Sequence, residues 1–126
     1  MLKNLAFRLP RYSGLPYLVR AFIQNRRVTI ALFHQIEPEL FARHLGILKR
    51  SYNLIGLQDY LKARHDAAFK LPAKALILTF DDGHRSNRAL LDVIRREQAP
   101  VTIFLCSGIV GTKRGFWFNR PLPFNV

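Results

Sequence analysis

The stretch that decides the fold is ALILTFDDGH, residues 75–84, in which an apolar run ends at two adjacent carboxylates and a glycine. Residues 75–80 are short, apolar and preceded by Pro72, which favours a strand buried on both faces over a helix. In parallel α/β sheets and barrels, ligands bind at the carboxyl ends of the strands. We therefore expect Asp81 and Asp82 to lie where the chemistry takes place.

Two adjacent carboxylates at a strand end allow two different roles. Gly83 can adopt a positive φ angle and bend the chain so that both carboxylates face one cavity. One of them can then bind a divalent metal ion while the other takes a proton from the water that attacks a carbonyl. The same residues also fit an ordinary strand-to-helix turn, because Asp is common in turns and favourable near a helix N-terminus. A following helix is predicted, capped by Ser86 or Asn87 and stopped by Pro100.

The surrounding sequence resembles one family. TFDDG at residues 79–83 is followed by the predicted helix and by a third strand over residues 101–106, which begins VTIFL. This arrangement is similar to the first motif and the next strand of the polysaccharide deacetylase family, also called carbohydrate esterase family 4 or the NodB homology domain. LFHQI at residues 32–36 and GFWF at residues 115–118 are similar to its bacterial exopolysaccharide-linked branch.

The resemblance covers roughly residues 28–119 and implies both an activity and site residues. In the family the first Asp of the motif is the catalytic base and the second is a metal ligand, which implies these roles for Asp81 and Asp82 respectively. The implied enzyme is a metal-dependent hydrolase that acts on carbon–nitrogen bonds other than peptide bonds. It would remove N-acetyl or similar acyl groups from an amino-sugar polysaccharide, with a zinc-like divalent metal as cofactor.

His34 is the third candidate site residue. Residues 28–33 are rich in β-branched side chains and predict a first strand that ends at His34. This strand should run parallel to residues 75–80, so that His34 and Asp81 share one rim. In the branch that residues 32–34 resemble, a histidine on the first strand is the general acid that protonates the departing amine, a role that suits imidazole. The alternative is a histidine that ends the strand and bonds to backbone.

Chain length limits the predicted fold. A deformed (β/α) barrel of about seven strands needs close to 200 residues, at roughly 25 to 30 residues per unit, whereas this chain has 126. We therefore expect an α/β fold that is an incomplete deformed (β/α) barrel of the NodB type. Residues 1–27 would form a basic amphipathic arm, and residues 28–126 the truncated amino-terminal part of a polysaccharide deacetylase-like domain.

The expected metal site is incomplete as well. The family's second motif, His-Ser/Thr-x-x-His, supplies two imidazole ligands. The chain has four isolated histidines that do not reproduce its spacing, namely His34, His44, His65 and His84. Asp82 is then the one ligand that the motif assigns. The alternative to an enzyme is a non-catalytic, truncated or vestigial basic module that binds a membrane surface or a glycan.

Charge and apolar patterning limit the partners. Twenty Lys and Arg against eight Asp and Glu give a net charge of +12, which favours anionic partners. No zinc-finger, RRM or helix-turn-helix pattern accompanies the charge, so nucleic acid is not the expected partner. Residues 15–23 place apolar side chains at helical spacing among basic residues, which fits either an anionic membrane surface or packing against the missing part of a barrel. Residues 1–27 contain no signal peptide or membrane-spanning run, which favours the cytoplasm or the inner face of the membrane.

Cys106 is the one cysteine of the chain, so an intramolecular disulfide and a cysteine zinc cluster are both excluded. Its position at the end of an apolar run favours a buried thiol on a strand over a nucleophile. No sequence feature specifies an oligomeric state.

Overall fold

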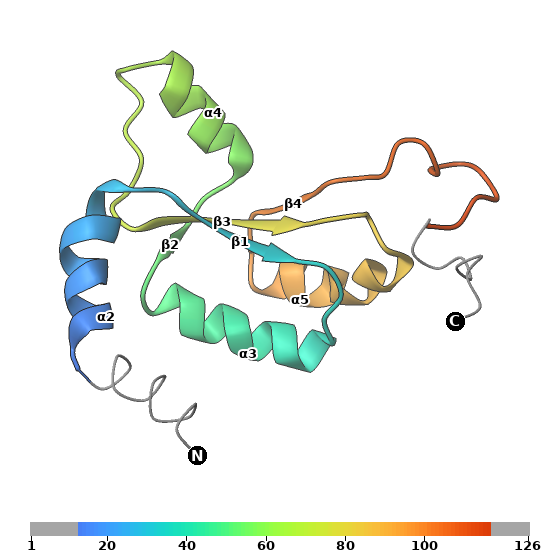
Figure 1. Ribbon diagram of the computed structural model, residues 1–126, viewed down its shortest axis with the longest axis horizontal. Coiled ribbons are helices and arrows are strands. Elements are labelled where there is room, and N and C mark those ends of the chain that lie inside the picture. The colour runs from blue at the N-terminus through green and yellow to red at the C-terminus, as the bar shows by residue number, and fades with distance from the viewer. Residues whose placement is uncertain (1–12, 117–126) are drawn as a thin grey trace, which may run out of the picture.

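The computed structural model describes residues 13–116 as an α/β fold with a parallel sheet (Figure 1). Residues 1–12 of the predicted basic arm and part of the GFWF segment, Trp117 and Phe118, lie outside the described residues. In chain order the elements are α2 (Leu15–Leu18), the π-helical η1 (Val19–Ile23), the 3-10 helix η2 (Gln24–Arg26), β1 (Thr29–Phe33), α3 (Pro38–Lys49), β2 (Asn53–Leu54), α4 (Leu57–His65), β3 (Ala75–Phe80), the 3-10 helix η3 (Arg85–Leu90), α5 (Leu91–Arg96) and β4 (Val101–Ile103).

Strand β3 is the centre of the sheet. Strand β1 pairs with it in parallel along one edge, with Phe33 opposite Phe80, so the two strands end level. On the other edge, β2 pairs with the start of β3 and β4 with its end, both in parallel. The expected parallel pairing of the first and central strands is confirmed, as is the position of the third strand beside the central one.

The third strand is shorter than the sequence predicts. Strand β4 ends at Ile103, and one further bond joins the Phe104 amide to the Phe80 carbonyl at 2.8 Å. Strand β3 ends at Phe80, and the chain turns away after it, so residues 104–106 have no partner strand to extend the ladder. The predicted strand over residues 101–106 is therefore wrong in its second half.

Every residue of β3 is buried, which confirms the prediction of a strand covered on both faces. One face, with Leu78 and Phe80, packs against Phe41 and Leu45 of α3 and against residues of η3 and α5. The other face, with Ala75 and Ile77, packs against Ile55 and the start of α4. In Figure 1, α3 and α5 accordingly lie on one side of the sheet and α4 on the other. Among the described residues no helix is long and apolar enough to span a membrane.

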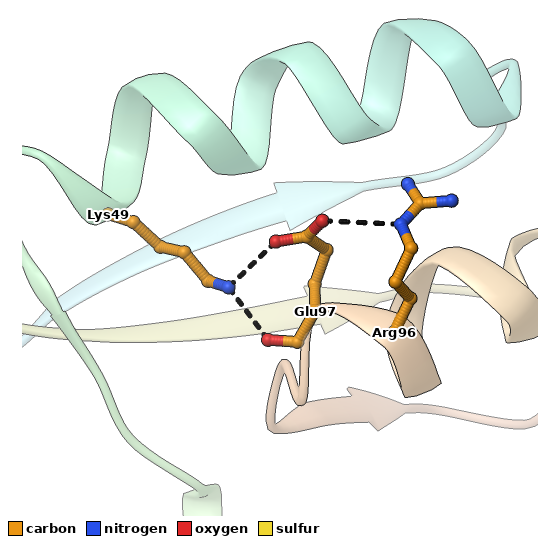
Figure 2. A network of polar contacts seen from close by, with 3 residues as sticks. All are labelled: Lys49, Arg96 and Glu97. Atoms are coloured by element: carbon orange, nitrogen blue, oxygen red, sulfur yellow. Dashed lines mark hydrogen bonds and ion pairs between the residues drawn. The ribbon is translucent and has the colours of Figure 1, made fainter.

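Helices α3 and α5 are also joined at their C-terminal ends (Figure 2). The Lys49 ammonium donates to the carboxylate of Glu97 at 2.9 Å and to its carbonyl oxygen at 2.7 Å. Arg96 donates from Nε to the same carboxylate at 3.4 Å. Bonding and charge from Lys49, with a further bond from Arg96, hold the pKa of Glu97 below its ordinary value. This network joins α3 and α5, the two helices that pack against the carboxyl end of β3.

Candidate functional site

The predicted site begins in the turn that follows β3. The Asp81 amide donates to the Phe33 carbonyl at 3.0 Å, which extends the pairing of β1 and β3 one residue beyond the strands. The chain then turns through two residues of positive φ, Asp82 at 66° and Gly83 at 60°. The Gly83 amide closes the turn on the Asp81 carbonyl at 2.8 Å. The positive φ expected of Gly83 is observed, and the left-handed conformation of Asp82 is an addition that the sequence did not predict.

A left-handed residue other than glycine is uncommon, and Asp is among the side chains that tolerate it best. The two aspartates therefore differ in their backbone: Asp81 still pairs with β1, whereas Asp82 is in the left-handed conformation. Both side chains are partly buried. The turn thus presents two carboxylates at the carboxyl end of the sheet, where ligands bind in parallel α/β folds.

His34 lies on the same rim. It follows β1 directly, and its Nδ1 is 3.7 Å from Oδ2 of Asp82. The His34 side chain is 62% exposed and the Asp82 side chain 32%, so the pair is open to solvent. His34 and Asp82, two of the three predicted site residues, are thus in direct contact. The third, Asp81, directly precedes Asp82 in the turn.

Cys106 is a further group at the rim that sequence reasoning did not place there. Its thiol donates to Oδ1 of Asp82 at an Sγ–O distance of 3.7 Å. Burial raises the pKa of the Cys106 thiol above its ordinary value, and the Asp82 carboxylate raises it further. The expected strand cysteine is instead partly buried in the loop after β4, because that strand ends at Ile103. The signal available in the sequence was its position at the end of the apolar run 101–106.

A cavity of about 220 Å³ adjoins the turn, between η3 and the residues that follow β4. Its apolar wall includes Leu91 and Leu105, and its polar wall includes Arg85, Asn87 and Arg88. The Asn87 side chain is buried, and its amide atoms have no hydrogen-bond partner among the described residues. Gly83 and His84 of the turn line this cavity, whereas Asp81 and Asp82 do not.

The other histidines have structural positions. His84 caps η3, since its Nδ1 accepts from the Ser86 amide, and its ring stacks on Phe116 at 6.0 Å between centroids. The predicted cap at Ser86 or Asn87 is thus wrong by two or three residues. His44 lies on α3 with its ring 6.4 Å from that of Phe33.

The residues present fit only part of a zinc site. Within residues 13–116, no group of three or more His, Cys, Asp or Glu side chains is arranged to hold a metal ion. A zinc site ordinarily takes at least three protein ligands. Asp82 offers one carboxylate ligand, with His34 in contact with one of its oxygens and the Cys106 thiol bonded to the other.

Comparison with known proteins found one family model and several solved structures that are similar to this chain. Residues 69–117 match a family model described as polysaccharide deacetylase. A de-N-acetylase from Aggregatibacter actinomycetemcomitans is similar in structure at a TM-score of 0.53 and 22% identity, with 60% of this chain and 36% of that chain covered. IcaB from Ammonifex degensii is similar at a TM-score of 0.57 and 28% identity, with 69% of this chain and 41% of that chain covered. The chain thus spans well under half the length of these solved structures, and a search of curated proteins found no match.

Proposed function

We propose, because residues 69–117 match the polysaccharide deacetylase family model, that this chain is part of a hydrolase that removes N-acetyl groups from an amino-sugar polysaccharide. The observation that carries the proposal is the turn after β3, which presents Asp81 and Asp82 at the end of a fully buried central strand. Its place beside the end of β1 matches the carboxyl-end location of sites in (β/α) barrels. The parallel sheet over residues 29–103 would be the first part of such a barrel.

In this proposal Asp81 is the general base. Its backbone amide is bonded to the Phe33 carbonyl of β1, so the backbone that carries the carboxylate has a defined place on the rim. The carboxylate would take a proton from water as the water oxygen attacks the acyl carbon. The carbon–nitrogen bond then breaks, and the acyl group leaves as a carboxylate while the sugar keeps the nitrogen as an amine.

His34 would give the departing nitrogen its proton. The contact between its Nδ1 and the Asp82 carboxylate orients the ring and leaves Nε2 for the substrate. The exposure of the ring is compatible with a polymer that approaches from solvent. Imidazole is the side chain whose protonation changes near neutral pH, which suits it to this transfer.

Asp82 would contribute one ligand to a divalent metal ion of the zinc type. The described residues lack the remaining ligands, so a complete metal site requires groups beyond them. The proposal therefore predicts that the described part of the chain alone binds zinc weakly.

A chimaera tests the proposed function. Residues 29–116 would replace the aligned part of the Aggregatibacter de-N-acetylase, and acetate release from N-acetylglucosamine oligomers would be measured together with bound metal. We expect Asp81→Asn to lower turnover by about 10²-fold or more with metal content unchanged, and Asp82→Asn to lower metal content. Asp92→Asn, on the exposed surface of α5, is the matched control and should change neither quantity. Full turnover in the Asp81→Asn chimaera would contradict the role of base.

A further inference from the structure

The helical segment formed by α2, η1 and η2, residues 15–26, carries its apolar side chains on the outside. Phe22 is 77% exposed, although a phenylalanine at a helical position is ordinarily covered. Four more large apolar side chains of this segment are 49% to 70% exposed: Leu15, Tyr17, Leu18 and Ile23. Leu15, Leu18 and Phe22 are spaced three and four residues apart, the spacing that places side chains along one helix face.

The side of this segment that meets the rest of the domain makes mostly polar contacts. Gln24 accepts a hydrogen bond from the Tyr52 hydroxyl at 2.8 Å. Tyr17 and Ala21 line a cavity together with Arg50, Ser51 and Lys74, which belong to the domain, although most of the Tyr17 side chain stays exposed. A surface helix normally turns its apolar stripe to the core and its polar face to solvent. Here the orientation is reversed, so the apolar stripe has no cover from the described part of the chain.

The charge of this region has a single sign. Residues 1–36 contain six basic side chains and no acidic one: Lys3, Arg8, Arg11, Arg20, Arg26 and Arg27. Arg26 and Arg27 are exposed directly after the apolar stripe. An apolar stripe flanked by cations, with no carboxylate to oppose them, is the chemistry of a helix that lies in the interface of an anionic membrane.

We propose that residues 15–27 dock this protein on an anionic lipid bilayer. The bilayer satisfies both features together, because its headgroups bear negative charge and its acyl layer receives the apolar side chains. An acidic glycan would neutralise the charge and leave Phe22 and its neighbours in water. A purely apolar partner would leave the arginines without counter-charge.

The position of the segment agrees with such docking. Residues 15–26 lead into the amino end of β1, whereas the aspartates and His34 follow the carboxyl ends of the strands. In Figure 1, α2 and the tips of the strand arrows accordingly lie at opposite ends of the sheet. A protein docked through this segment would keep the proposed site directed away from the lipid and open to a polymer.

Vesicle co-sedimentation of the full chain tests the proposal. We expect the chain to bind vesicles that contain phosphatidylglycerol and not vesicles of phosphatidylcholine alone. Phe22→Asp should weaken binding by at least about tenfold, since burial of one phenylalanine side chain changes a partition constant by that order. Arg26→Ser with Arg27→Ser should weaken it by about tenfold or more and reduce its salt sensitivity. Circular dichroism would verify that the variants remain folded.

Leu61→Asp is the matched control, because Leu61 is an exposed apolar residue of α4, on another part of the surface. This variant should bind vesicles like the unmodified chain. Absence of binding to phosphatidylglycerol vesicles, equal binding to neutral vesicles, or equal losses in Leu61→Asp and Phe22→Asp would each overturn the proposal. Because the vesicles hold no glycan, the result is independent of the proposed deacetylase activity.

Discussion

Replacement of Gly83 by alanine should destabilise the protein through the turn that carries the aspartates. Gly83 has φ +60°, a left-handed conformation that costs an L-residue about 1–2 kcal/mol. An added Cβ would also overlap Cδ2 of Leu105. Leu105 is exposed, so its side-chain tip can move and adds little to the cost. We therefore expect Gly83→Ala to lower the free energy of unfolding by about 1–2 kcal/mol.

Gly46 provides a control of opposite sign. It lies inside α3, and a Cβ built on it meets nothing within 4 Å. Gly46→Ala should therefore raise the free energy of unfolding by about 0.5–1 kcal/mol, because alanine loses less conformational freedom in a helix. Urea unfolding followed by circular dichroism measures both variants. A Gly83→Ala protein as stable as the unmodified chain would refute the assigned backbone conformation, and with it the geometry of the turn.

Three further predictions rest on other parts of the structure. Leu45→Ala, at a fully buried position of α3, should lower the free energy of unfolding by about 2–5 kcal/mol in urea titrations. Lys49→Met should reduce stability at neutral pH. The folded pKa of Glu97 is lowered, so the contribution of the Lys49–Glu97 pair to the free energy of unfolding is fully present above the ordinary glutamate pKa of about 4.3. This contribution is lost as the pH falls through the lowered pKa, and the free energies of unfolding of variant and parent should converge there. Alkylation of Cys106 should require a higher pH than a free thiol, and Asp82→Asn should lower that pH, as iodoacetamide rates would show.

The features predicted from sequence are those that local patterning determines. The apolar run before Asp81 predicts a strand buried on both faces, and β3 is one. The β-branched residues before His34 predict the strand that pairs with it. The class of fold and the shared rim follow, because parallel strands bring their carboxyl ends to one edge. The roles of these residues stay predictions, since geometry alone does not test them.

The features missed depend on contacts between distant segments. Cys106 reaches Asp82 because β4 ends early, and that end is set by the length of β3. The left-handed φ of Asp82 arises in a turn whose sequence also fits other geometries. The apolar period of residues 15–23 was visible, but a period shows only which residues share a face. It does not show whether that face meets the core or the solvent, and only the exposure of Phe22 and its neighbours in the structure shows that it meets the solvent.

The measurement that tests the central claim most directly is the turnover and bound metal of His34→Ala in the deacetylase chimaera. His34 lies outside the TFDDG motif, so its role depends on the rim that β1 and β3 form together. We predict that turnover falls by about 10²-fold or more while metal content is unchanged. His65→Ala, at the end of α4, is the control and should leave both unchanged. Loss of bound metal would make His34 a ligand instead of an acid, and unchanged turnover would contradict a catalytic role for the rim's histidine.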